Sequence, residues 1–282
     1  MSFATLPELI LEPLVKSALM EDLGSYGDVT TRAVIPDDVT YSARLRAREE
    51  AVVSGMQVAA LAFRLVDANL RVKTLVADGA ACQPGDVLME IEGKAASILM
   101  GERVALNFAG RLTGIATLTA AMVAETRGTE ARVTCTRKTT PGLRMVEKLA
   151  VLHGGGFNHR YSLSDAILIK DNHIAAAGGI RAVLDATKAH ASHMMAVEIE
   201  VDTLDQLREV LEVGGASVVL LDNMTPDQLR EAVQINAGRL ALEASGNVKR
   251  DTVAAIAATG VNYISSGALT HSARTVDLGL DF

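Results

Sequence analysis

The second half of the chain alternates short apolar runs with stretches whose apolar positions recur every three or four residues. A continuous apolar run suits a strand buried on both faces, and such strands alternate with helices in βα units that form a parallel sheet. The residues that close the later runs are spaced by 30, 22, 23 and 21 positions, which favours a barrel-like sheet. We predict six strands, in the segments ARVTCT, DAILIK, MAVEIEV, SVVLLD, RLALEAS and VNYISS.

Two of the helices between these strands carry start and stop signals. Thr203 and Thr225 stand where side-chain N-caps are expected. Gly214 and Gly238 stand where the two helices should end. Because six strands in ~150 residues are fewer than a closed eight-stranded barrel needs, typically ~250 residues, the pattern predicts an incomplete α/β barrel.

The first half of the chain has a different character, because its short strand patterns end at turn signals and helical patterns flank them. This indicates an α+β sandwich domain before the barrel, and we place the two domains at 1–113 and 114–269. The predicted elements are a helix at about 7–22, strands within 40–49, 51–59, 71–80 and 86–93, and a long, largely buried helix from about 98 to 125.

Composition narrows the class of protein. The chain has 282 residues, 49% of them hydrophobic, and a formal net charge of −7, which excludes intrinsic disorder and makes a nucleic-acid partner unexpected. Two cysteines give no disulfide framework, and no apolar run is long enough to span a membrane. The first basic residue is Lys16, after Glu8 and Glu12, so the N-terminus resembles no targeting signal and we expect a cytoplasmic protein.

Charged residues close three of the predicted apolar strands. These residues are Lys170, Glu200 and Asp222, and parallel strands bring their carboxyl ends to one edge of the sheet. A charge at the end of a buried strand is costly unless it has a partner or a ligand. We therefore expect the three side chains to meet in one site, with an internal salt-bridge network as the structural alternative.

A local excess of positive charge lies between positions 127 and 173, where eight Lys and Arg face four Asp and Glu. Arg binds carboxylates and phosphates through two parallel hydrogen bonds, and Lys acts as a point charge. The excess predicts a small polyanionic ligand, whereas a solvated basic face is the simpler reading of such a run. Arg144 and Lys148, four positions apart on a predicted helix, are the members that we expect to be merely solvated.

Two short loops follow the last two predicted strands, Ser245-Gly246-Asn247 and Ser266-Gly267-Ala268. Glycine allows a backbone to approach a phosphate closely, and barrels hold phosphate at the loops after their last strands. As a pair they predict a phosphate site. The histidines of the segment 153–159 lack the spacing of a metal motif, so we do not expect them to bind a metal.

Several long motifs, in the same order, resemble those of the quinolinate phosphoribosyltransferase family. The resemblance runs from about residue 20 to the C-terminus and rests on EDLGSYGDVTT, ERVALNFAGRLTGIAT, TRKTTPGLR, EKLAVLHGGGFNHRYSLSDAILIKDNH, VEIEVD, LLDNM and LEASGN. It implies a type II phosphoribosyltransferase fold, in which 270–282 returns to the first domain, and at least a homodimer with shared active sites. It also implies that quinolinate and phosphoribosyl pyrophosphate are converted, with Mg²⁺, to nicotinate mononucleotide, pyrophosphate and CO₂ in de novo NAD synthesis.

The resemblance also implies roles for particular residues. Lys138, Lys170, Glu200 and Asp222 would be catalytic, and Glu200 and Asp222 would hold the ribose hydroxyls and Mg²⁺. Arg103 would come from the neighbouring subunit. The residues implied to bind substrate are Arg103, Thr136, Arg137, Lys138, His159, Arg160, Lys170, Glu200, Asp222, Ser245, Gly246, Asn247, Ser266, Gly267 and Ala268.

Three alternatives remain open from the sequence. A molybdenum-associated pyrophosphorylase-like paralogue would share the fold, and the discriminating feature is the Lys170-Asp171 pair. A Schiff-base lyase could use Lys170, because a strand-end lysine is a typical imine-forming position. A non-catalytic binding protein would explain the cations but not the carboxylates. The sequence also leaves the reactivity of Cys135 undecided.

Overall fold

The computed structural model describes residues 5–282, which divide into two compact units. The first unit combines the chain up to Ala120 with Thr140–Gly155 and Ser272–Phe282. The second unit combines Ala121–Thr139 with Gly156–His271. Each unit therefore contains segments that are distant in sequence.

An antiparallel sheet forms one layer of the first unit, with the strand order β12-β1-β5-β3. Burial alternates along β1, where Ala43, Leu45 and Ala47 point into the core. The C-terminal strand β12 pairs with β1, so the end of the chain is part of this sheet. The strands are β1 (Thr40–Ala47), β3 (Arg71–Thr74), β5 (Val87–Lys94) and β12 (Leu278–Asp281), with a separate pair formed by β2 (Ala51–Val52) and β4 (Ala81–Cys82).

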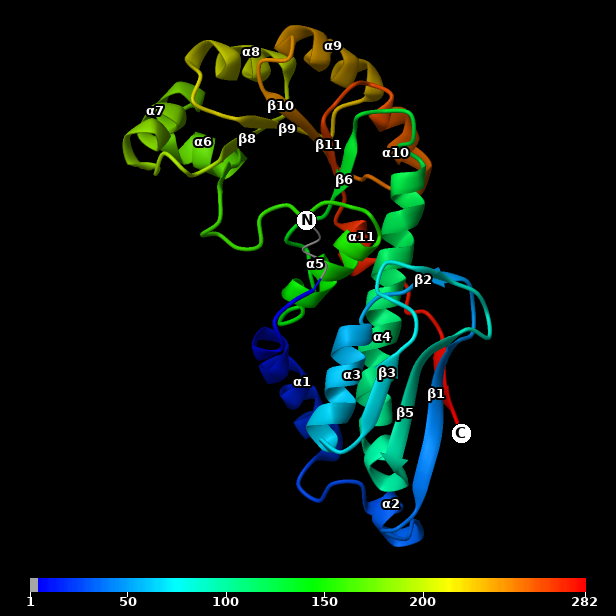
Figure 1. Cartoon of the computed structure of the whole chain (residues 1–282). Helices are drawn as coiled ribbons and strands as arrows, with labels where there is room; N and C mark the ends of the chain where they lie inside the picture. Colours follow the sequence, from blue (N-terminus) through cyan, green and yellow to red (C-terminus); the bar gives the residue numbers. More distant parts are fainter. Residues whose placement is uncertain (1–4) are drawn as a thin grey trace. The chain divides into compact units, whose positions relative to one another are not determined.

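Helices form the other layers of this unit. Helix α3 packs beside β3, and α1 packs on α3 (Figure 1). The predicted helices at about 7–22 and 98–125 are confirmed as α1 and α4. The helices are α1 (Glu8–Leu23), α2 (Val29–Val34), α3 (Met56–Val66), α4 (Ala95–Ala124), whose residues to Ala120 belong to this unit, and α5 (Arg144–His153).

The strand predicted within 51–59 is wrong beyond its first two residues. Gly55 adopts a φ of +92°, which ends the extended segment. The backbone N–H of Met56 then donates to Asp78 Oδ1 at 3.0 Å, which satisfies a donor in the first turn of α3. Nearly every position of helix α3 from Met56 to Phe63 is buried. This part of the helix therefore lacks the polar face that would have distinguished it from a buried strand.

The second unit is built on a parallel sheet of six strands in the order β6-β11-β10-β9-β8-β7. No pairing joins β6 to β7 among the described residues, so the barrel is incomplete, as predicted. The helices α7, α8, α9 and α10 pack against one another in succession along the sheet (Figure 1). The strands are β6 (Arg132–Thr134), β7 (Ile167–Ile169), β8 (Val197–Val201), β9 (Val218–Asp222), β10 (Ala241–Ser245) and β11 (Tyr263–Ser265).

The helix signals in this unit are mostly confirmed. Thr203 and Thr225 accept from the backbone N–H three residues on, and α8 ends at Gly214. The predicted stop at Gly238 is one residue late, because Ala237 takes the left-handed conformation that ends α9. The buried Asn236 side chain bonds the N–H and C=O of Leu240, which closes the turn early. The helices are α6 (Asp171–Ala177), α7 (Ile180–His190), α8 (Leu204–Val213), α9 (Pro226–Asn236), α10 (Arg250–Ala257) and α11 (Ala268–His271).

No helix among the described residues is both long and apolar enough to cross a membrane.

Candidate active site

The carboxyl ends of the parallel strands carry the polar residues singled out from the sequence. Asp222 and Ser245 are register partners at the ends of β9 and β10. Glu200 pairs in register with Leu220, two positions before Asp222, so Glu200 lies one layer deeper in the sheet. All the predicted site residues except Arg103 belong to this second unit. Arg103 is an exposed residue of α4 in the first unit.

Lys170 and Glu200 meet between the edge strand β7 and its neighbour β8. Lys170 Nζ forms an ion pair with Glu200 Oε2. The lysine side chain is 47% exposed and the carboxylate only 13%, so the pair lies at the opening of the sheet rather than within its core. The ammonium group of Lys170 is therefore accessible to a ligand, while the less exposed Glu200 carboxylate holds it in place. Helix α6 begins at the next residue and fixes the backbone of Lys170.

The loops after β9 and β10 interlock. Asn223 Nδ2 donates to Asp222 Oδ2 at 2.6 Å, and the Asn223 backbone N–H donates to the carbonyl of Ser245 at 2.9 Å. Gly246 has a φ of +99°, and a Cβ there would lie 2.2 Å from Asn223 Oδ1, so glycine is required. Asn223 was not among the predicted site residues, although it follows the strand-end Asp222 directly.

The loop after β11 joins the same set of contacts. Ser266 Oγ donates to the carbonyl of Val248 at 2.8 Å, and Thr270 Oγ1 donates to the carbonyl of Lys138 at 2.7 Å. A Cβ on Gly267 would lie 2.9 Å from Lys138 Cδ, so this glycine gives room for the lysine stem. The structure thus brings the predicted lysine and the predicted phosphate loops together on one rim.

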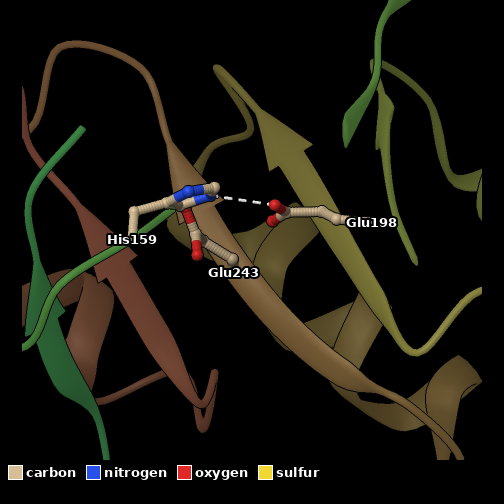
Figure 2. A group of neighbouring side chains, drawn as sticks. All are labelled: His159, Glu198 and Glu243. Atoms are coloured by element: carbon tan, nitrogen blue, oxygen red, sulfur yellow. Dashed lines mark ion pairs between the residues drawn. The ribbon is translucent and has the colours of Figure 1, made fainter. Parts of the chain in front are cut away.

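A buried cluster lies deeper in the sheet, where His159 faces two carboxylates (Figure 2). His159 Nε2 lies 2.9 Å from Glu198 Oε2 and 3.7 Å from Glu243 Oε1. The other oxygen of Glu198 is buried and has no hydrogen-bond partner among the described residues. Neither glutamate was among the predicted site residues. The sequence signal for them is that each lies two positions before a predicted site residue, Glu198 before Glu200 and Glu243 before Ser245. Side chains two positions apart on a strand point to the same face of the sheet.

The ligand atoms of His159, Glu198 and Glu243 lie within 4.8 Å of one another, as in a metal site. However, the backbone N–H of Arg160 donates to His159 Nδ1 at 2.8 Å. That bond uses the lone pair of Nδ1 and places the ring proton on Nε2, which faces the carboxylates. An Nε2 that carries a proton donates a hydrogen bond and does not ligate a metal. We therefore interpret this cluster as hydrogen-bonded.

Two arginines crowd their charges next to this cluster. Burial lowers the pKa of Arg160, and the like charge of Arg137 lowers it further, while Glu198 and Asp165 act in the opposite direction. Arg160 Nη1 also donates to the carbonyl of Ala166 at 2.9 Å. Because two neighbouring guanidinium groups repel each other, a bound anion would stabilise both.

Two expectations about single residues are corrected or refined. Lys148 was expected to be a solvated surface lysine, but it is fully buried in α5, because this helix turns that face into the core of the first unit. Cys135 is also buried, and its Sγ donates to Asn158 Oδ1 at 3.1 Å. Its position offers no access to a solution reactant.

Known proteins resemble this chain over nearly its full length. Residues 28–113 match the family model of the quinolinate phosphoribosyl transferase N-terminal domain, and residues 115–281 match that of the C-terminal domain. A quinolinate phosphoribosyltransferase [decarboxylating] 1b of Nicotiana tabacum is 43% identical, with 97% of this chain and 83% of the relative aligned. A probable nicotinate-nucleotide pyrophosphorylase [carboxylating] of Bacillus subtilis is 40% identical, with 97% and 93% aligned. The solved nicotinate-nucleotide pyrophosphorylase of Francisella tularensis is 38% identical and superposes with a TM-score of 0.93, covering 100% of this chain and 99% of that one.

Proposed function

The chain belongs to the quinolinate phosphoribosyltransferase family, and from that premise we propose how its site works. The enzyme transfers the phosphoribosyl group of phosphoribosyl pyrophosphate to quinolinate with decarboxylation. The products are nicotinate mononucleotide, pyrophosphate and CO₂, a step of de novo NAD synthesis. The observation that carries the proposal is the ion pair of Lys170 and Glu200 at the strand ends of the parallel sheet. The same sheet carries the Ser-Gly loops at the ends of β10 and β11, and Arg160 of the same unit feels the like charge of Arg137.

The cations bind the negatively charged groups of both substrates. Quinolinate is a dianion, and we propose that its carboxylates lie against Arg137 and Arg160, whose mutual repulsion they relieve. Lys138 and Lys170 face the phosphate groups. Thr136 accepts from the Lys138 backbone N–H at 3.0 Å and so shapes the loop that carries both Arg137 and Lys138. His159 anchors the backbone of Arg160 from below.

The phosphoribosyl group would lie across the rim. We place the 5′-phosphate at the loops Ser245–Asn247 and Ser266–Ala268, where glycines let the backbone approach a phosphate. The carboxylates of Glu200 and Asp222 face the ribose hydroxyls. They also favour the positive charge that builds at the sugar C1 as pyrophosphate leaves.

The chemistry needs no covalent nucleophile. The bond from the quinolinate ring nitrogen to C1 forms as the bond from C1 to the pyrophosphate oxygen breaks. Holding the two substrates in line can supply ~7–11 kcal/mol of the barrier. Once the ring nitrogen carries a positive charge, the carboxylate at C2 leaves as CO₂, because the electron pair left at C2 is stabilised by the adjacent N⁺. That carbon then takes up one proton.

The donor set at the strand ends fits Mg²⁺. Asp222 is a partly exposed carboxylate with one oxygen bonded to Asn223, and Glu200 shares its charge with Lys170. Mg²⁺ prefers oxygen ligands and is commonly held by one or two carboxylates, waters and substrate phosphates. We propose Asp222, with Glu200 beside it, as the protein's contribution. When bound, the ion neutralises charge on the pyrophosphate leaving group.

The two other enzymatic readings are not favoured. The relatives are named for the quinolinate reaction, and Lys170-Asp171 is present as that reading expects. The Lys170 side chain forms an ion pair with Glu200. This pair favours the charged ammonium form of Lys170, whereas an imine-forming lysine must be a neutral amine.

The test is an assay of the purified protein with quinolinate, phosphoribosyl pyrophosphate and Mg²⁺, following nicotinate mononucleotide and CO₂. Nicotinate is run in parallel as the alternative acceptor. We expect equal amounts of both products from quinolinate and none from nicotinate. A folded protein that turns over neither acceptor would overturn the proposal and would favour the paralogue or a binding protein.

We further propose a homodimer in which Arg103 completes the site of the neighbouring subunit. Arg103 is exposed on α4, which allows it to reach another chain. The test mixes two inactive variants, R103A and K170A. If the subunits exchange at random in a symmetric dimer, half of the dimers carry one intact site, and about a quarter of the wild-type activity returns. No recovery in mixed dimers that are shown to form would contradict the shared site.

A reducing, cytoplasmic compartment is our proposal for its location. Both cysteines are free and buried, as is common for proteins that do not meet an oxidising environment. Cell fractionation checks this expectation.

A further inference from the structure

We propose that Asn223 is a positioning residue that fixes the spacing between the Asp222 carboxylate and the Ser245–Asn247 loop. The site thereby accepts a ribose 5-phosphate group, whose hydroxyls and phosphate are a fixed distance apart. The inference rests on the proposed function, because that function places the ribose at Asp222 and the phosphate at the loop.

The contacts of Asn223 reach both parts of the site. Its Nδ2 donates to Asp222 Oδ2 at 2.6 Å, a charge-assisted bond. Its Oδ1 accepts from Asn247 Nδ2 at 3.4 Å, and its backbone N–H donates to the carbonyl of Ser245 at 2.9 Å. One side chain and its own backbone thus connect the carboxylate of one strand end with the loop of the next.

The backbone makes this connection stiff. Asn223, Gly246 and Asn247 have φ values of +53°, +99° and +51°. The residue after each turn, Met224 or Val248, is buried and anchors its loop to the core. Because a Cβ at Gly246 would collide with Asn223, the two turns are packed in direct contact. The distance between the Asp222 carboxylate and the Ser245–Asn247 loop is therefore fixed by the fold.

The residue type follows from two requirements. A φ of +53° is tolerated chiefly by Gly, Asn and Asp. Among these three, only Asn can donate a hydrogen bond to the Asp222 carboxylate. The bond engages Oδ2 and leaves Oδ1 with no bond to any described residue, available to a hydroxyl or a cation.

The ligand consequence comes from the furanose ring. Its hydroxyls and its 5′-phosphate lie on opposite faces of the ring. They can bind the Asp222 carboxylate and the Ser245–Asn247 loop at the same time only if these two groups are correctly spaced. Quinolinate is bound by other residues in the proposed function. Loss of the Asn223 side chain should therefore weaken phosphoribosyl ligands and spare quinolinate.

The experiment compares N223G and N223D with A237G. N223G keeps a residue suited to positive φ and removes the amide. N223D keeps the shape but sets a second carboxylate against Asp222. Ala237 also has positive φ, at +47°, but it ends α9 before the start of β10, so A237G controls for a new glycine at such a position. Calorimetry measures the Kd of ribose 5-phosphate and of quinolinate, and kinetics measure the KM of each substrate.

We expect N223G to weaken ribose 5-phosphate about 10-fold, the effect of one charge-assisted hydrogen bond, and N223D to weaken it more. The Kd of quinolinate should stay within about 2-fold for every variant, and A237G should match the wild type. Equal weakening of both ligands, or no weakening of ribose 5-phosphate, would overturn the inference. Wild-type protein that binds ribose 5-phosphate through Asn223 but shows no turnover would overturn the proposed function and leave this inference standing.

Discussion

Two buried glutamates, one in each unit, are bonded very differently. Glu147 in the first unit is fully buried, and both of its oxygens accept hydrogen bonds, from Arg111 Nη2 at 3.0 Å and from the Thr140 backbone N–H at 3.0 Å. Glu198 in the second unit is 7% exposed, but only one of its oxygens has a hydrogen-bond partner among the described residues, His159. Burial alone does not separate the two.

Completeness of bonding does separate them. A buried polar group without partners costs free energy, so a carboxylate that the fold uses for itself is normally bonded at both oxygens. A carboxylate with one unbonded oxygen is tolerated at a functional site, where a ligand or neighbouring cations can interact with that oxygen. We therefore expect changes in the first unit's polar network to alter stability, and changes at the strand ends of the second unit to alter activity.

The largest expected effect is on stability, from E147A. The change leaves Arg111, whose side chain is only 23% exposed, without its carboxylate partner and also removes two bonds to Thr140. Breaking a buried ion pair in this way typically costs about 3–5 kcal/mol of unfolding free energy. Urea denaturation measures it.

The matched control is E21A, which removes an exposed glutamate of α1 in the same unit. We expect its unfolding free energy to stay within about 0.5 kcal/mol of the wild type. If E147A were as stable as E21A, the completed network would not be structural, and the comparison between the units would fail.

The second prediction concerns activity and tests the other side of the comparison. K170A should lower kcat/KM by about 10²–10³-fold, or ~2.7–4 kcal/mol, because a preorganised cation at the leaving group is lost. Its unfolding free energy should fall by about 1 kcal/mol, less than for E147A, because water screens a pair whose lysine is 47% exposed, although Glu200, 13% exposed, loses its partner. Steady-state kinetics and urea denaturation are measured on the same preparation.

K188A is a suitable control for this change. Lys188 has a similar exposure of 43% and also forms an ion pair, with Asp185, but on helix α7 instead of at a strand end. We expect full activity from K188A. Equal losses from the two variants would mean that any surface cation of this unit matters, and the strand-end assignment would be wrong.

The sequence predicts the parallel sheet and its rim well because both depend on local signals. Apolar runs followed by a charge or a Ser-Gly pair locate each strand end, and the sheet then gathers them. What the sequence misses depends on packing. Met56 starts a helix because Asp78, far along the chain, caps it, and Glu243 reaches His159 only through the sheet register. Asn223 belongs to the same class.

The third prediction is a smaller loss of stability, from S54A. Ser54 Oγ lies 2.8 Å from His153 Nδ1, and both residues are buried in the first unit. Removing this hydroxyl takes one hydrogen bond from a buried imidazole, which typically costs about 1–3 kcal/mol. Thermal unfolding measures it, with S42A on the exposed side of β1 as the control. Loss of activity at unchanged stability would give the Ser54–His153 pair a role at the site and blur the division between the units.

The smallest expected effect tests whether completeness of bonding matters at the surface as well. Glu49 accepts from Arg274 Nη1 at 2.7 Å and from the Asp277 backbone N–H at 3.0 Å, bonds that hold the C-terminal segment. The guanidinium of Arg274 and this N–H lower the pKa of Glu49 from 4.5 to about 2. The ionised carboxylate therefore contributes stability above pH 4.5, and this contribution is lost as the pH falls towards about 2.

E49Q removes that titration. At pH 7 we expect it to be less stable than the wild type by at most about 1 kcal/mol, because an ion pair near the surface is screened by water and salt. Thermal unfolding from pH 7 down to pH 3 should show the difference between the two proteins shrinking below pH 4.5. A difference that grows on acidification would reverse the sign of the linkage. It would show that the fold favours the neutral form of Glu49. A surface carboxylate with all its hydrogen bonds made would then not stabilise the fold, in contrast to the buried carboxylate of Glu147.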